Sequence, residues 1–310
     1  FENNAEFSLG MCLATRHQRD RLRKQVEKLL AGMGCGPAEG ELASAARAWL
    51  DGYLQNDGSS QRTENLVAAL ATSGRAADPE VASILADREH LTKKSLWMYG
   101  GDGWAYDIGY GGLDHVMASG EDVNILVVDT EVYSNTGGQS SKATPLGAVA
   151  QFAASGKRAA KKNLGLIAMQ AGTVYVAQVA MGADQGQLVK VLEEAESYPG
   201  PSLIIAYAPC IAHGIVKGMS YAQEEAKLAV QSGYWHLYRF DPRLKERGEN
   251  PFRLDSKEPI LPLRDFLRNE VRFTALARTF PERAEEMMEL AEKSAAELSA
   301  KYARMALEGV

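Results

Sequence analysis

Hydrophobic positions recur at helical spacing through the first 95 residues. Within 15–34, Leu22, Val26, Leu29 and Leu30 recur every three or four positions, and glycines follow at 32 and 34. Apolar residues at that spacing form one face of an amphipathic helix, and glycine is typical of a helix end. Further segments repeat the pattern between turn residues, over 40–55, 60–74 and 78–94. We therefore expect a helical segment over residues 1–94 that packs on the domain after it.

From residue 95 onwards the pattern changes to short apolar runs separated by amphipathic stretches. The apolar runs predict strands over 95–101, 123–131, 164–170, 174–182, 202–210 and 234–241. The amphipathic stretches predict helices over 107–119, 145–155, 184–197 and 219–233. Strands that alternate with helices indicate βαβ units and a mostly parallel sheet with helices on its faces. We therefore predict one doubly wound α/β domain over residues 95–240.

The last part of the chain has a different residue pattern. Proline, glycine and charged residues fill 240–259, which is typical of an irregular crossing segment, and a polar helix is expected over 281–309. The predicted organisation is thus a helical segment, an α/β domain, and a tail over 241–310 made of the crossing segment and a helix.

Composition narrows the class of protein. The 310 residues are 45% hydrophobic and 24% charged with a net charge of −6, which indicates a globular protein and argues against nucleic acid or an anionic membrane as partner. The apolar runs are too short to span a bilayer. Three cysteines form no disulfide framework, which favours a reducing compartment. The chain begins at Phe1 without an initiator Met, so we expect it to be a piece of a longer polypeptide.

A glycine-rich turn after the first predicted strand carries an unexpected acid. The stretch 98–112 reads MYGGDGWAYDIGYGG, and it lies where open α/β sheets bind ligands, between a strand end and the next helix. It contains neither a dinucleotide fingerprint nor a Walker A loop. A carboxylate repels a diphosphate unless a cation lies between them, and Mg²⁺ accepts carboxylate, carbonyl and phosphate oxygens. Asp102 therefore indicates a metal-bridged diphosphate; by itself it is equally compatible with a helix N-cap.

The second half of such a site is expected at the end of the neighbouring strand. That strand ends at Asp129 and Thr130, and a polar loop with glycines follows. Thr130 offers a hydroxyl and Val132 a backbone carbonyl as cation ligands. Ser134 and Asn135 offer hydrogen bonds to a phosphate or a substrate.

These features together resemble a known family. A G-D-G turn, a strand and then an Asn-containing loop resemble the diphosphate motif of thiamine diphosphate enzymes. The longer stretch 100–145, continued by 200–214 and 232–244, resembles the C-terminal thiamine diphosphate domain of the pyruvate:ferredoxin (flavodoxin) oxidoreductases. The likeness covers nearly the whole chain, the helical region included.

The resemblance implies roles for individual residues. It makes Asp102, Thr130 and the carbonyl of Val132 the magnesium ligands; thiamine enzymes more commonly carry Asn where Thr130 stands, whereas this family carries Thr. Asn135 would lie against the thiazolium and the bound pyruvate. The diphosphate would be contacted by Ser134 and by the turn Gly101, Asp102, Gly103 and Trp104.

The implied reaction is oxidative decarboxylation of pyruvate to acetyl-CoA and carbon dioxide, with electrons passed through 4Fe-4S clusters to ferredoxin or flavodoxin. The resemblance makes Cys210 one ligand of the cluster nearest the thiamine, although a lone cysteine at a strand end is by itself typical of a buried structural residue. Cys12 and Cys35 receive no role, and His213 is read as structural. The other cluster ligands and the glutamate that activates the cofactor are expected outside this chain.

The implied partners are the remaining domains of the enzyme, pyruvate, coenzyme A, ferredoxin or flavodoxin, and a second copy in a homodimer, in an anaerobic and cytoplasmic setting. One alternative is another 2-oxoacid:ferredoxin oxidoreductase with the same scaffold. A second is a non-catalytic α/β docking module whose G-D-G turn only caps a helix. The sequence leaves the 2-oxoacid, the electron acceptor and the physiological direction open.

Overall fold

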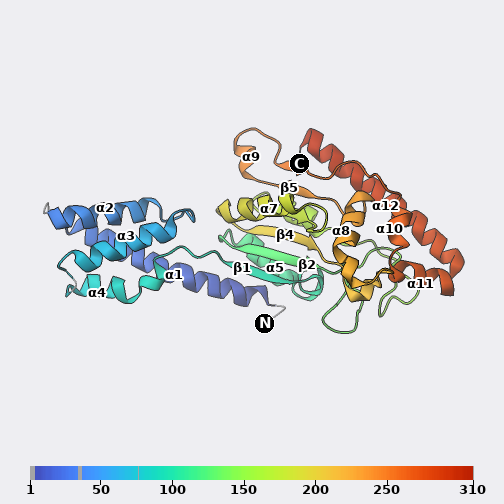
Figure 1. Ribbon diagram of the computed structural model, residues 1–310, viewed down its shortest axis with the longest axis horizontal. Coiled ribbons are helices and arrows are strands. Elements are labelled where there is room, and N and C mark those ends of the chain that lie inside the picture. The colour runs from blue at the N-terminus through green and yellow to red at the C-terminus, as the bar shows by residue number, and fades with distance from the viewer. Residues whose placement is uncertain (1–3, 34–36, 76, 310) are drawn as a thin grey trace. The chain divides into compact units, whose positions relative to one another are not determined.

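The computed structural model describes residues 4–33, 37–75 and 77–309, and the chain forms two compact units (Figure 1). One unit is Phe7–Leu96; the other is Trp97–Val310 together with Phe1–Glu6. Cys35 lies outside the described residues. The predicted packing of residues 1–94 on the following domain, like the predicted domain boundaries, stays a prediction.

The first unit is helical, as the spacing of its apolar residues predicts. Its helices are α1 (Ala5–Ala31), which begins in the other unit, α2 (Pro37–Asp51), α3 (Ser59–Thr72) and α4 (Pro79–Ala86). Leu22, Val26 and Leu29 are buried in one core with residues of the other three helices, and Leu30 packs at its edge. These three side chains lie on one face of α1 because they are separated by three or four residues.

A six-stranded sheet forms the centre of the second unit, in the order β1-β2-β4-β3-β5-β6. The strands are β1 (Trp97–Gly101), β2 (Asn124–Asp129), β3 (Tyr175–Val179), β4 (Ser202–Tyr207), β5 (Tyr238–Phe240) and β6 (Phe252–Leu254). The first four in this order are parallel to one another, whereas β5 and β6 are antiparallel to their neighbours. This confirms the predicted mostly parallel α/β fold.

Helices cover both faces of the sheet. Helix α7 (Gln185–Ser197) packs through Val191 and Ala195 against a face that includes Ile204 of β4. Helix α6 (Leu164–Gln170) lies over Ile205, because a Cβ added at Gly165 would come within 3.6 Å of its side chain. Successive residues of a strand point to opposite faces, so α6 and α7 lie on opposite sides. The domain is therefore doubly wound.

Two predicted elements have the wrong type. Residues 164–170, predicted as a strand, form α6, because the side chain of Asn163 accepts a hydrogen bond from the Leu166 amide at 2.9 Å and caps the helix. A short apolar run does not by itself distinguish a strand from a buried helix. Residues 145–155, predicted as a helix, are irregular: the amides of Gly147 and Val149 donate to Lys157 and Arg272 rather than along a helix.

The remaining elements surround the sheet. They are a π-helix over Gly103–Ile108, α5 (Tyr110–Ala118), short 3₁₀ turns over Ile211–His213 and Met219–Tyr221, α8 (Ala222–Gln231), α9 (Arg243–Glu246), α10 (Leu263–Leu267), α11 (Val271–Thr279) and α12 (Pro281–Glu308). Helix α12 confirms the predicted C-terminal helix. The segment 240–259, predicted as irregular, contains α9 and β6 as well. None of the described helices is both long and apolar enough to cross a membrane.

Candidate metal centre at the ends of two parallel strands

The carboxyl ends of β1 and β2 meet at one edge of the sheet. The two strands are parallel neighbours, and Gly101 pairs with Val128. Asp102 follows β1 directly, and Thr130 follows β2 directly. The shared edge brings these two side chains together, with the Thr130 hydroxyl 2.8 Å from Asp102 Oδ1. The sequence prediction that they belong to one site agrees with this geometry.

Oxygen atoms converge around the Thr130 hydroxyl. It also lies 3.0 Å from the carbonyl oxygen of Val132 and 3.2 Å from the Ser134 hydroxyl. Thr130 and Ser134 have one hydroxyl proton each, whereas a carboxylate and a carbonyl have none to donate. The cluster therefore holds more lone pairs than protons to fill them, which suits a hard cation such as Mg²⁺.

The Asp102 carboxyl lies in surroundings that disfavour its negative charge. It is 1% exposed, and burial raises its pKa to about 6, with the negative charge of Asp129 acting in the same direction. Hydroxyl donors partly offset this effect, from Thr130 to Oδ1 and from Ser141 to Oδ2 at 2.6 Å. A bound cation would stabilise the carboxylate further. The donor set thus fits the magnesium ion that the sequence implies.

The helix-cap interpretation of Asp102 receives no support from the geometry. Asp102 is the residue before the π-helix Gly103–Ile108, but its side chain makes no capping hydrogen bond to that helix. Both carboxylate oxygens are instead directed toward hydroxyls from other segments. π-helical turns occur frequently at functional sites.

Glycines at the end of β1 and just after it allow aromatic rings to pack closely against the backbone. A Cβ added at Gly103 would come within 2.3 Å of the Tyr133 ring, and one at Gly100 within 2.7 Å of the Trp104 ring. The Trp104 side chain is itself buried. Of the predicted diphosphate contacts, Trp104 therefore has only its main chain available, whereas Gly101 is exposed at the end of β1.

The loop after β2 presents the other predicted residues. Tyr133 and Gly138 close it through two backbone hydrogen bonds, Tyr133 N to Gln139 O at 2.9 Å and Gly138 N to Tyr133 O at 3.0 Å. Val132 is buried, whereas Ser134 and Asn135 are exposed. The structure thus gathers Asp102, Thr130, Val132 and Ser134 around one point and leaves the Asn135 amide free of that cluster on the same loop.

Cys210 lies at the same edge of the sheet. It follows β4, the neighbour of β2, and it is buried. The His213 Nδ1 is 3.4 Å from the Cys210 amide nitrogen, and the His213 Nε2 is 2.7 Å from the carbonyl oxygen of Thr130. His213 thus connects the backbone of Cys210 to the backbone of Thr130. No sequence pattern indicated this connection, because it joins residues 83 positions apart.

The candidate magnesium site does not contain a cluster of acidic side chains. Among residues 4–33, 37–75 and 77–309, no group of three or more His, Cys, Asp or Glu side chains could hold a metal ion. The oxygen cluster has one carboxylate, and the remaining oxygens are hydroxyls and a carbonyl. Cys210 offers a single thiol, so a 4Fe-4S cluster would need three more ligands from elsewhere.

A buried chain of ion pairs extends from the site into the protein. It runs from Asp129 through Lys161, Glu131 and Arg272 to Glu270, and successive partners are 2.7, 2.8, 2.7 and 2.7 Å apart. All four residues other than Lys161 are buried. Burial alone would raise the pKa of Glu131, but the charges of Lys161 and Arg272 outweigh it and lower that pKa. Sequence reasoning missed this network, which joins residues up to 141 positions apart.

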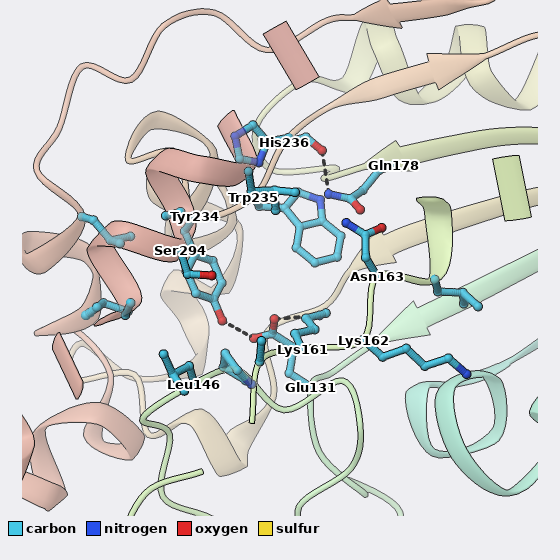
Figure 2. A pocket seen from close by; sticks show the side chains of 18 of the residues that line it. Glu131, Leu146, Lys161, Lys162, Asn163, Gln178, Tyr234, Trp235, His236 and Ser294 are labelled. Atoms are coloured by element: carbon cyan, nitrogen blue, oxygen red, sulfur yellow. Dashed lines mark hydrogen bonds and ion pairs between the residues drawn. The ribbon is translucent and has the colours of Figure 1, made fainter. Parts of the chain in front are cut away.

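The network also forms one wall of a cavity of about 130 Å³, shown in Figure 2. Glu131 and Lys161 are among its polar lining residues, and Leu298 and Tyr302 of α12 line it as well. The cavity therefore lies under α12, and the oxygen cluster around Thr130 is not part of it.

Comparison with known protein families shows which class of protein the chain resembles. The family described as "Thiamine pyrophosphate enzyme, C-terminal TPP binding domain" matches residues 70–206, a range that contains Asp102, Thr130 and Val132. This segment of the α/β fold is therefore similar to a thiamine pyrophosphate-binding domain. The resemblance to thiamine diphosphate enzymes that the sequence suggested is confirmed.

Three relatives show which thiamine diphosphate enzymes this chain resembles. Pyruvate:ferredoxin oxidoreductase of Moorella thermoacetica is 53% identical over 99% of this chain and 26% of its own length. Pyruvate-flavodoxin oxidoreductase of Klebsiella pneumoniae is 50% identical over 99% of this chain and 26% of its own length. The mitochondrial NADP⁺-dependent pyruvate dehydrogenase of Euglena gracilis is 46% identical over 92% of this chain and 16% of its own length. The chain spans about a quarter of the length of the first two, and its predicted similarity to this family is confirmed.

Proposed function

We propose that this chain is the segment that binds Mg²⁺ and thiamine diphosphate in an enzyme of pyruvate oxidation. The reaction is the oxidative decarboxylation of pyruvate to acetyl-CoA and carbon dioxide, with electrons passed through 4Fe-4S clusters to ferredoxin or flavodoxin. The observation that carries the proposal is the convergence of Asp102, Thr130 and Val132 at the ends of β1 and β2. This convergence lies inside the segment that matches a thiamine pyrophosphate-binding family.

The residues of this chain would bind and orient the cofactor. The Asp102 carboxylate, the Thr130 hydroxyl and the Val132 carbonyl would hold the magnesium ion. The Ser134 hydroxyl and the main chain of Gly101–Trp104 would contact the diphosphate. When bound, thiamine diphosphate supplies the nucleophilic carbon and the electron sink for decarboxylation. The exposed Asn135 amide, on the same loop, would orient the 2-oxo acid beside it.

The thiol of Cys210 would supply one ligand to a 4Fe-4S cluster. Its place at the carboxyl end of β4, the neighbour of β2, supports this role, because the cluster would then lie at the same sheet edge as the cofactor. The other three ligands and the glutamate that activates the cofactor would come from the remaining domains of the enzyme. We also propose coenzyme A as a substrate, a homodimeric assembly and a cytoplasmic location, all from the family resemblance.

The names of the relatives support pyruvate as the substrate more strongly than they support any one electron acceptor. Their names share pyruvate but differ in the acceptor, which is ferredoxin, flavodoxin or NADP⁺. All three resemble this chain over at least 92% of its length. We infer that this segment performs the step common to them and that the acceptor is selected by other parts of each enzyme.

Thiamine diphosphate released by acid from the full-length protein tests the proposal. We expect close to one cofactor per chain, and we expect Asp102→Ala to lose it, because the magnesium that bridges protein and diphosphate would have no carboxylate ligand. Asp114→Ala is the matched control, since Asp114 is exposed on α5, and it should retain the cofactor. Folded, cluster-containing protein without cofactor would contradict the catalytic role and favour the docking module.

A further inference from the structure

Glu131 has a backbone conformation that is unusual for a residue with a side chain. Its φ angle is 60°, and among the described residues only one other non-glycine residue, Phe152, has a positive φ. The left-handed region disfavours any residue with a Cβ, and such conformations persist only where the surrounding structure holds them. Phe152 is exposed, whereas Glu131 is buried.

This left-handed residue stands between two proposed magnesium ligands. Thr130 precedes it and Val132 follows it. An extended strand would carry the chain about 7 Å further over two residues, away from the end of β2. The chain instead turns at Glu131, and the Val132 carbonyl oxygen lies 3.0 Å from the Thr130 hydroxyl. The conformation of Glu131 therefore brings the two oxygens to the same point.

The side chain of Glu131 is held from several directions, as Figure 2 shows in part. Its Oε1 accepts from Lys161 Nζ at 2.8 Å. Its Oε2 accepts from the Tyr234 hydroxyl at 2.6 Å and from Arg272 Nη2 at 2.7 Å. Lys161 is also paired with Asp129, and Arg272 with Glu270, so both cations are themselves anchored. These contacts can offset the unfavourable backbone conformation.

The main chain of Glu131 is held as well. Its amide donates to Asp129 Oδ1 at 3.1 Å, and its carbonyl accepts from the Thr144 hydroxyl. Backbone and side chain are therefore both tied to elements other than the loop itself. Glycine would adopt the same φ without strain, but it would lack the carboxylate that anchors the turn.

We propose that Glu131 is a positioning residue whose buried ion pairs hold the left-handed turn that aims the Thr130 hydroxyl and the Val132 carbonyl at one cation. This inference rests on the proposed magnesium and thiamine diphosphate site. Glu131 does not contact the cation; it acts through its two neighbours in the chain.

Comparison of alanine and glycine at position 131 tests this role. Both substitutions remove the same ion pairs, but only alanine retains the cost of a Cβ in the left-handed region. The probe is Mn²⁺ in the presence of thiamine diphosphate, with its affinity for the full-length protein measured by electron paramagnetic resonance. We expect Glu131→Ala to bind Mn²⁺ about tenfold more weakly than wild type and Glu131→Gly to recover most of that loss.

Two outcomes would overturn the inference. Wild-type affinity in Glu131→Ala would mean that the turn needs no anchor. Equal losses in the alanine and glycine variants would mean that the left-handed conformation at position 131 does not determine the affinity for the cation. Failure of the wild-type protein to bind Mn²⁺, or unchanged binding in Asp102→Ala, would instead refute the proposed metal site.

If the variants at position 131 do not fold, a milder pair of substitutions tests the role of Glu131. Tyr234→Phe removes the 2.6 Å hydrogen bond to Glu131 and the longer one, 3.4 Å, from Arg272 Nη2, and it preserves the ring. Tyr175→Phe is the matched control, because its ring is buried and its hydroxyl donates to Glu194, outside the ion-pair network of Glu131. We expect the first to weaken Mn²⁺ binding about threefold and the second to leave it unchanged. Equal affinities in the two variants would contradict the role of Glu131.

Discussion

At the scale of single residues, the site depends on one buried carboxylate and the hydroxyls around it. Both oxygens of Asp102 accept hydrogen bonds, from Thr130 and from Ser141. The Ser141 hydroxyl is buried and also accepts from the amide of Ala143 at 3.0 Å, so its orientation is set by its own loop. Sequence reasoning did not select Ser141, because nothing in its neighbourhood distinguishes it from the adjacent Ser140.

Ser141→Ala should therefore weaken the proposed metal site without abolishing it. Loss of a buried hydrogen bond to a charged group costs about 1.5–3 kcal/mol, so we expect Mg²⁺ affinity in the presence of thiamine diphosphate to fall at least about tenfold. Isothermal titration of the full-length protein measures this, with Ser140→Ala as the matched control. Equal affinities in the two variants would show that Ser141 does not support the Asp102 carboxylate.

At the scale of elements, the C-terminal helix is joined to the sheet by aromatic and histidine contacts. Tyr302 of α12 lies 5.1 Å from the Tyr238 ring of β5 and 5.8 Å from the Phe252 ring of β6, between ring centroids. His236, just before β5, contacts Ser299 of α12 at 2.7 Å through Nε2. These contacts bury the imidazole, and burial lowers its pKa to about 4.

His236 should make stability depend on pH in the acid range. The unfolded chain binds a proton near the ordinary histidine pKa of about 6.5, whereas the folded protein does so only near 4. The stability contributed by the neutral imidazole is therefore complete above about pH 6.5 and is lost as pH falls toward 4. From pH 7 to 5 the loss should be about 2 kcal/mol. Urea unfolding of wild type and of His236→Gln at both pH values checks this; equal pH dependence would contradict it.

At the scale of the whole molecule, one sheet edge brings together the proposed magnesium ligands and the candidate cluster ligand. Asp102, Thr130 and Cys210 follow β1, β2 and β4, which are consecutive parallel strands in the sheet. Parallel strands place their carboxyl ends on the same side, so residues far apart in sequence share one site. A cofactor and a cluster bound at these residues would lie close together because of the strand order.

Cys210→Ser should remove one iron–sulfur cluster and leave thiamine diphosphate bound. In the full-length protein we expect the iron content to fall by about four atoms per chain, since one cluster would lose a thiolate ligand. Thiamine diphosphate should remain bound, because the Asp102 site is intact. Cys12→Ser, at a buried cysteine of α1, is the matched control and should leave the iron content unchanged. Unchanged iron in Cys210→Ser would contradict the cluster role.

The sequence by itself determined the features that depend on local periodicity. The spacing of Leu22, Val26 and Leu29 predicted α1, and the apolar run that became β2 predicted a buried parallel strand. The G-D-G turn and the Thr130 loop predicted one site, because strand ends in such sheets meet at one edge. Each of these inferences needs only neighbouring residues and a general rule of packing.

Only the tertiary structure decided the rest. Whether 164–170 is a strand or a helix depended on the Asn163 cap and on Tyr238, whose hydroxyl lies against Gly165. The anchoring of Glu131 depended on Arg272, and the tie between Cys210 and Thr130 depended on His213. Contacts between residues so far apart leave no periodic signal, because burial and ion pairing are set by which surfaces the folded chain brings together.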